Sequence, residues 1–271
     1  MPGPHLPPPS RPLGDLTRGT THPNRLRRID RWLVATQLAR LRRADAPVVV
    51  DLGYGRDPVT TIELASRLTR QVPAVRVVGV EIDRERVAAA QRFAGPGLRF
   101  ACGGFNLPLT PDERPATVVR AMNVLRQYGE ADAAQAWEVL QGQLGEDGLL
   151  VEGTCDELGR RAGWVSIDAK GPRTLTFAAR VADLPRPSAL AERLPKALIH
   201  HNVAGERVHD FFTAWDATWR TAAGAVTPRE RWVAAAAGLA EQGWRIGRNP
   251  ARWREGELTI AWTAVAPRTG G

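Results

Sequence analysis

A glycine-containing turn with acidic neighbours is the part of this chain whose residue types and spacing could do chemistry. Residues 47–53, PVVVDLG, form a β-branched run typical of a strand buried on both faces, and glycines stand at Gly53 and Gly55. Glycine directly after a buried strand lets the chain turn sharply and lets a ligand approach the backbone. A helix predicted over residues 59–71 would present unpaired N–H groups nearby. The sequence therefore predicts a ligand site at the end of this strand.

A second acidic group lies at the end of the next predicted strand, residues 75–82, which contains Glu81 and is followed by Asp83. A carboxylate at this place can accept hydrogen bonds from both hydroxyls of a ribose. Asp51 and Asp57 would repel a pyrophosphate, and the turn lacks the third glycine of the dinucleotide fingerprint. These charges suit a ligand with a cationic end, such as S-adenosylmethionine, which carries an ammonium and a sulfonium but no phosphate.

Strands and helices alternate through the first part of the chain, which indicates a parallel sheet with helices on both faces. Further strands are predicted at 98–102, 116–121 and 148–154, and further helices at 24–43, 83–93 and 130–144. Asn24 is a candidate cap of the first helix. Beyond residue 155 the pattern predicts a hairpin (164–168 and 173–181), helices (187–222 and 228–242) and a last strand in ELTIAWTAVAP. We expect an α/β fold with a doubly wound, mostly parallel, seven-stranded sheet and an inserted helical lobe.

The segment from about 47 to 154 resembles the class I S-adenosylmethionine-dependent methyltransferases. VVVDLGYG is similar to their first motif and VVGVEID to their second, while RFACGGFN resembles the segment after the third strand. ATVVRAMNVLRQY and GEDGLLVEGT are similar to the fourth-strand motif and to the turn with the fifth strand. The resemblance implies a Rossmann-like methyltransferase fold, S-adenosyl-L-methionine as cofactor, and methyl transfer by in-line displacement to a small-molecule acceptor. The missing third glycine and a longer spacing to Glu81 depart from the family pattern.

The resemblance also implies roles on the methionine side of the cofactor. The residues concerned are Asp51, Gly53, Tyr54, Gly55, Arg120 and Asn123. Asp51 would hold the methionine amine directly or through water, and the glycines would let the backbone approach. The segment from Arg120 to Asn123 would form the floor near the methyl group. Simpler structural roles stay open for two of these residues, because Asp51 could cap a helix or turn and Asn123 could be a turn residue.

On the nucleoside side, the resemblance implies that Glu81 accepts the ribose hydroxyls, with Ile82 packing on the adenine and Asp83 nearby. The residues implied to flank the adenine are Gly104, Phe105 and Asn106. Structural roles stay open here as well, since Glu81 could be a surface carboxylate and Asp83 a helix or turn cap.

A hydroxyl acceptor needs a base, and histidine is the side chain best suited to proton transfer near neutral pH. His22, His200 and His209 are the candidate bases. At the end of the fifth strand, three acids lie where an acceptor could sit: Glu152, Asp156 and Glu157. Trp215 and Trp219 share a helical face and could form core packing or an aromatic acceptor pocket.

Residues 1–20 contain MPGPHLPPPSRP and are predicted to form a disordered, proline-rich tail. Residues 21–271 would form the methyltransferase domain, with 182–226 as a helical insertion on the acceptor side.

The formal net charge of +8 raises the question of a nucleic-acid partner. Lys occurs only at positions 170 and 196, so 35 of the 37 basic residues are Arg, and they are spread along the chain. Without clustering, the charge makes RNA or DNA a less favoured partner, and an RNA methyltransferase a less favoured function. The sequence also leaves open an NAD(P)-dependent oxidoreductase and a non-catalytic interaction protein with this fold.

Cys102 and Cys155 are far apart and form no metal-ligand pattern, so we expect no metal site and a reducing, cytoplasmic environment. No apolar run approaches the roughly 20 residues of a membrane span, and the N-terminus lacks an apolar signal core. The expected partner is therefore a small molecule and not a membrane, and the sequence leaves the oligomeric state open.

Overall fold

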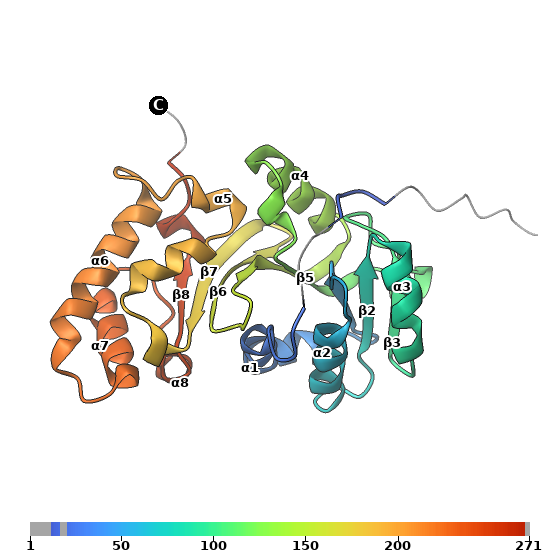
Figure 1. The fold of residues 1–271 in the computed structure, drawn as a ribbon, viewed down its shortest axis with the longest axis horizontal. Coiled ribbons are helices and arrows are strands. Elements are labelled where there is room, and N and C mark those ends of the chain that lie inside the picture. Colours follow the sequence, from blue (N-terminus) through green and yellow to red (C-terminus); the bar gives the residue numbers. More distant parts are fainter. Residues whose placement is uncertain (1–11, 17–20, 269–271) are drawn as a thin grey trace, which may run out of the picture.

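An eight-stranded sheet forms the centre of the computed structural model, which describes residues 12–16 and 21–268 (Figure 1). The strands lie in the order β3-β2-β1-β4-β5-β6-β7-β8. They are β1 (Val48–Leu52), β2 (Arg76–Glu81), β3 (Leu98–Cys102), β4 (Ala116–Met122), β5 (Leu144–Cys155), β6 (Arg161–Asp168), β7 (Gly171–Ala179) and β8 (Glu257–Ala261). Strands β1 to β5 pair in parallel, and β6, β7 and β8 extend the sheet by antiparallel pairing.

The predicted doubly wound α/β class is confirmed, but the described sheet has eight strands and not seven. The hairpin of β6 and β7 joins the sheet beside β5, and β8 then pairs with the free edge of β7. The central strands are buried on both faces, as their β-branched runs predict, and Val50 lies between Val78 and Val119 of the neighbouring strands.

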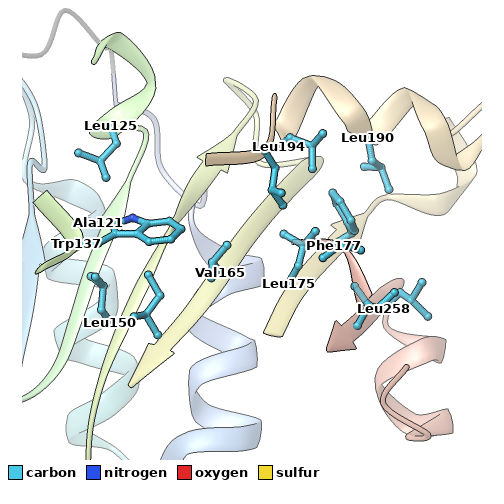
Figure 2. Close-up of a cluster of buried hydrophobic side chains, with 14 of the residues drawn as sticks. Ala121, Leu125, Trp137, Leu150, Val165, Leu175, Phe177, Leu190, Leu194 and Leu258 are labelled. Carbon is cyan, nitrogen blue, oxygen red and sulfur yellow. The ribbon is translucent and has the colours of Figure 1, made fainter. Parts of the chain in front are cut away.

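Helices cover both faces of the sheet (Figure 1). The α-helices are α1 (Arg27–Arg43), α2 (Val59–Thr69), α3 (Arg84–Ala90), α4 (Glu130–Gln141), α5 (Lys196–Ile199), α6 (Arg207–Thr221), α7 (Pro228–Glu241) and α8 (Pro250–Arg254). Leu33 of α1 and Leu64 of α2 pack with Val49 on one face. On the other face Trp137 of α4 joins a larger cluster that extends to α6 and α7. Figure 2 shows the part of this cluster from Trp137 to Phe177 and Leu190.

The predicted helix over 187–222 is wrong in its continuity, because the segment breaks into the 3₁₀ helix η5 (Pro187–Arg193), α5 and α6. Pro195 stands between η5 and α5, where its ring cannot continue a helix. Trp215 and Trp219 are buried, and Trp215 meets Trp232 of α7 at a centroid distance of 5.0 Å. The described structure thus uses these tryptophans as core packing.

Asn24 is not the cap of the first helix, which begins at Arg27 after Leu26. Its φ of 62° places Asn24 in the left-handed region, and its N–H donates to the Glu63 carboxylate at 2.8 Å. Asn24 therefore forms a turn that joins the start of α1 to α2. No helix of the described residues is long and apolar enough to cross a membrane.

A buried ion network ties β1, β4 and α1 together beneath the end of the sheet. Arg120 on β4 is fully buried, and its Nε lies 2.8 Å from Asp51 Oδ1 on β1. Its Nη1 also pairs with Asp30 on α1. Burial by itself would lower the pKa of Arg120, but the carboxylates of Asp51 and Asp30 outweigh it and raise the pKa above its ordinary value. Arg120 therefore stays charged in the core.

Arg120→Met tests this network, because it leaves two buried carboxylates without their shared cation. We expect the free energy of unfolding to fall by about 3–5 kcal/mol, measured by urea denaturation near neutral pH. The matched control is Arg43→Met, which removes an exposed ion pair with Asp147 and should change the value by less than about 1 kcal/mol. Equal effects of the two substitutions would contradict the expected large contribution of the buried network to the free energy of unfolding.

Candidate functional site

A cavity of about 500 Å³ opens where β1, β4 and β5 end, and Asp51, Met122 and Cys155 line it. The strand order reverses here, because β1 pairs with β2 on one side and with β4 on the other. Ligands of open α/β sheets bind at such a switch point, outside the carboxyl ends of the strands. The cavity therefore lies where the sequence predicts a ligand site.

The predicted glycine turn forms one wall of this cavity. Gly53 and Gly55 have φ values of 71° and 84°, which L side chains rarely adopt. A Cβ atom on Gly53 would also meet the Val124 side chain at 2.7 Å. Tyr54 between them turns its ring inward onto Phe100, at a centroid distance of 5.5 Å. The backbone of the turn thus lines the cavity.

Asp51 lines the cavity at its base, but its oxygens already have partners. Thr61 Oγ1 donates to Asp51 Oδ2 at 2.6 Å, and Arg120 holds both oxygens. Arg120 itself has no exposed surface and lies below the cavity, so it does not form the floor that the resemblance implied. The predicted contact between Asp51 and a methionine amine stays a prediction.

Asn123 lines the cavity as a turn residue, with a φ of 63°. Its Oδ1 accepts a hydrogen bond from the Cys155 amide at 2.9 Å, and its Nδ2 donates to Cys155 Sγ at 3.2 Å. Asn123 therefore joins the ends of β4 and β5. Its backbone conformation is that of a turn residue, which is one of the two roles that the sequence left open.

Glu81 is buried at the end of β2 and connects that strand to the glycine turn. Gly55 donates its amide hydrogen to Glu81 Oε2 at 2.8 Å, and Ile82 donates to Oε1 at 3.0 Å. Burial raises the pKa of this carboxyl, while the Gly55 amide and Arg86 oppose the rise. Glu81 is thus not a surface carboxylate. Asp83 caps α3, because its Oδ1 accepts from the Glu85 amide at 2.8 Å.

The residues expected beside the adenine hold a segment of the chain itself. We call residues 12–16 the N-terminal strap. Leu13 donates its amide hydrogen to Asn106 Oδ1 at 2.7 Å and accepts from the Phe105 amide at 2.8 Å. A Cβ atom on Gly104 would lie 1.9 Å from the Leu13 carbonyl oxygen, so the strap passes directly over this glycine.

The strap leaves little space above the end of β2. The cavity that it encloses with Glu81 and Ile82 has a volume of about 20 Å³, which is room for about one water molecule. At its other end, Asp15 donates its amide hydrogen to the Tyr128 hydroxyl and accepts from Gln127 Nε2 at 3.3 Å. Of the predicted tail over 1–20, residues 1–11 and 17–20 lie outside the described residues.

None of the three candidate bases lines the 500 Å³ cavity. We call the segment from η5 to α7, residues 187–241, the outer lobe. His200 follows the end of α5, and His209 lies on α6 in this lobe. His22 is exposed beside Thr21, which does line the cavity and donates its hydroxyl to the Tyr54 carbonyl at 2.8 Å. Within residues 12–16 and 21–268, no group of three His, Cys, Asp or Glu side chains could hold a metal ion.

The three acids expected at the end of β5 have different surroundings. Asp156 lines the cavity, but its oxygens accept from the amides of Arg160 and Arg161 at 2.8 and 3.0 Å and so close the turn to β6. Glu157 is exposed at the rim. Glu152 faces the apolar cluster around Trp137 and lies outside the cavity.

Sequence reasoning missed several residues of the cavity wall, and three of them are cations: Arg25, Arg126 and Arg193. Arg193 comes from η5, which is held over the sheet because the Thr154 hydroxyl donates to the Arg193 carbonyl at 2.8 Å. Arg126 lies within the segment ATVVRAMNVLRQY that resembles the fourth-strand motif, so the sequence offered a signal for it. Arg25 and Arg193 offered none, because only the folded chain brings them to this place.

Glu152 makes the stability of the protein depend on pH. Neither carboxylate oxygen has a hydrogen-bond partner, and burial raises the pKa of Glu152 to about 8, with a small opposing effect of Trp137. Its ordinary pKa in the unfolded chain is 4.5, so the native state keeps a proton that the unfolded state releases. The free energy of unfolding should therefore fall as the pH rises through this window.

Glu152→Gln replaces the protonated acid by a neutral amide of similar shape and should remove this dependence. From about pH 5 to about pH 8, we expect wild type to lose roughly 1 kcal/mol or more relative to the variant, measured by urea unfolding at several pH values. Glu138→Gln on the exposed side of α4 is the control and should follow wild type. Parallel curves for wild type and Glu152→Gln would contradict the burial argument.

This chain is similar to several solved structures of methyltransferases. The CcbJ methyltransferase from Streptomyces caelestis aligns at 20% identity over 58% of this chain and 66% of its own, with a TM-score of 0.36. Magnesium protoporphyrin IX methyltransferase from Synechocystis, with bound SAH, aligns at 21% identity over 49% of this chain and 55% of its own, with a TM-score of 0.36.

An S-adenosylmethionine-dependent methyltransferase from Clostridium acetobutylicum aligns at 12% identity over 56% of this chain and 60% of its own, with a TM-score of 0.36. This chain spans less than two thirds of the length of each of these three proteins. No protein-family model matches the sequence, and no curated protein matches it.

Proposed function

We propose that this protein is an S-adenosylmethionine-dependent methyltransferase that acts on a small-molecule acceptor. The observation that carries the proposal is the hydrogen bond from the Gly55 amide to the buried Glu81 carboxylate, at the switch point of the sheet. It joins a backbone wall that a ligand can approach to an acid that can hold a ribose. The methionine end would occupy the 500 Å³ cavity, and Glu81 with Ile82 would hold the nucleoside end.

The charges around the glycine turn support a cationic cofactor over a dinucleotide. Asp57 Oδ1 accepts from the Val59 amide at 2.9 Å, so a carboxylate already occupies the start of α2. A pyrophosphate usually binds at such a helix start, and here the Asp57 carboxylate would repel it. Asp51 adds a second negative group in the cavity, although Arg120 partly neutralises it. An ammonium or sulfonium would instead be attracted.

The chemistry of the cofactor would be a methyl group already activated by a sulfonium, which reacts by in-line displacement. The protein then has mainly to align the acceptor and keep water out of the line of attack. Gly53 and Asn123, at the ends of β1 and β4, both line the cavity and would bound this space. Within the described residues, the cavity wall has no histidine, which favours an acceptor that needs no strong base.

The N-terminal strap would have to move for the nucleoside to reach Glu81. In the described conformation the space there is about 20 Å³, far below the size of an adenosine. The Phe105 amide, which would lie beside the adenine, instead donates to the Leu13 carbonyl. The strap and the nucleoside therefore compete for the same backbone positions.

Removing residues 1–16 should strengthen binding of S-adenosylhomocysteine by about threefold or more, because no contact of the strap then has to be broken. Calorimetric titration of the shortened chain against the full chain measures the change. The control is a chain that lacks residues 1–11 only and keeps the strap, which should bind as the full chain does. Weaker binding after removal of 1–16 would mean that the strap is part of the cofactor site.

Glu81→Gln tests the ribose contact and the proposed function together. The amide oxygen can still accept from the Gly55 amide, so the turn is kept, while the charge that binds two hydroxyls and the acceptor for the Ile82 amide are lost. We expect the dissociation constant of S-adenosylhomocysteine to rise by about tenfold or more, by calorimetry, and the unfolding transition of the variant shows that it is folded. Glu85→Gln, at the exposed start of α3, is the matched control.

Unchanged affinity in Glu81→Gln would overturn the role of Glu81. Binding of NADH or NADPH by the wild-type chain, with no binding of S-adenosylhomocysteine, would overturn the cofactor assignment in favour of an oxidoreductase. Absence of binding to both kinds of cofactor would favour a non-catalytic interaction protein.

A further inference from the structure

Two arginines from distant parts of the chain line the 500 Å³ cavity, and Arg126 lies beside the residue that precedes Arg193. Arg126 lies in the 3₁₀ helix η3 (Leu125–Gln127) after β4, and Arg193 ends η5 in the outer lobe. The pKa of Arg126 is lowered by partial burial and then by the positive charge of Arg193. Two guanidinium groups that repel each other at a cavity wall form a site of positive potential.

The partners of these two side chains do not balance their charges. Arg126 Nη1 meets the Glu192 carbonyl, at 3.5 Å. Arg193 Nη2 pairs with the Glu192 carboxylate at 3.3 Å, but that carboxylate is 67% exposed and its pair is screened by water. Arg193 Nε is buried and has no hydrogen-bond acceptor among the described residues. A buried N–H without an acceptor is costly, so the site is completed when an acceptor enters it.

The acids of the same cavity are held by other groups. Asp51 is held by Arg120 and Thr61, and Asp156 by the amides that close the β5–β6 turn. Glu157 is exposed at the rim. The positive potential of the arginine pair therefore reaches into the cavity without an unpaired buried carboxylate to cancel it.

We infer that the acceptor carries an anionic oxygen group, a carboxylate or a phosphate, which Arg126 and Arg193 bind. This inference rests on the proposed methyl transfer, in which the glycine turn and Glu81 hold the cofactor on the opposite side. Arg193 Nη1 reaches the Cys155 carbonyl at 3.5 Å, which places its guanidinium over the end of β5, away from β2. Arginine binds carboxylate and phosphate by paired N–H donors, so the pair would select acceptors and orient them.

The experiment uses the full chain saturated with S-adenosylhomocysteine and three probes that share a ring: benzoate, phenyl phosphate and the neutral benzamide. Their dissociation constants are measured by calorimetry or by ligand-observed NMR. We expect at least one anion to bind about tenfold or more tightly than benzamide. Comparison of benzoate with phenyl phosphate tells which anion the pair prefers.

Arg126→Gln and Arg193→Gln should each reduce the preference for the anion to less than about threefold, with little change in the affinity for S-adenosylhomocysteine. Arg160→Gln is the matched control, because Arg160 is exposed, pairs with Asp183 and lies outside the cavity wall. Unfolding midpoints show whether each variant is folded.

Equal binding of benzamide and both anions by the wild-type chain would overturn the inference. So would variants that keep the anion preference but bind S-adenosylhomocysteine more weakly, because the arginines would then hold the carboxylate of the cofactor itself. If the wild-type chain does not bind S-adenosylhomocysteine, the proposed function fails. The probes are then titrated into the free chain, where an anion preference that Arg193→Gln abolishes still supports the anion site.

Discussion

The buried contact between Arg120 and Asp51 is the interaction on which the rest of the site depends. It joins neighbouring residues of β4 and β1 at the strand ends, and Asp30 extends it to α1. A charged group in a core is stable only when its partners and hydrogen bonds are complete, so these three elements must hold one arrangement. The cavity opens directly above this network. Its base is therefore rigid, and the charge of Asp51 is only partly available to a ligand.

A second link runs from β2 to the glycine turn through Glu81. Because the Gly55 amide donates to this carboxylate, the positions of the backbone wall and of the proposed ribose acceptor are coupled. The N-terminal strap lies across the same region and uses the amide of Phe105. The described conformation thus has an open cavity beside the glycine turn and a nearly closed space above the end of β2, with volumes of about 500 and about 20 Å³.

The outer lobe contributes to the described cavity wall through one segment, η5. The helices α6 and α7 lie at the end of the molecule opposite β2 and β3 (Figure 1), and Trp215 of α6 packs against Trp232 of α7 there. From this lobe η5 reaches back over the sheet, where Thr154 holds the Arg193 carbonyl. The lobe therefore supplies a charged side chain to the cavity while its tryptophans stabilise the lobe. Arg193 and the glycine turn, which both line the cavity, therefore come from different parts of the fold.

Local sequence determined much of this protein by itself. Short apolar runs alternating with helices predicted the five parallel strands, and Gly53 and Gly55 predicted the sharp turn, because only glycine adopts such backbone angles readily. The sequence offered a cap role for Asp83 and placed Glu81 at the end of β2. The prediction of Asn24 as a helix cap was wrong. Asparagine favours both helix caps and left-handed turns, so the residue type alone does not distinguish them. The expected total of seven strands was wrong, because local pattern does not tell how many of the later strands join the sheet.

Tertiary structure alone decided which side chains meet. The fully buried state of Arg120 depends on Asp30, which is 90 residues away in sequence. Arg193 and Arg126 line the same cavity only because η5 folds over β5, and the pKa of Glu152 is raised only because the folded chain buries it. The three histidines carried a chemical signal in the sequence but lie outside the cavity wall. Residue type and local spacing report backbone conformation, whereas burial and charge balance arise from contacts between distant segments.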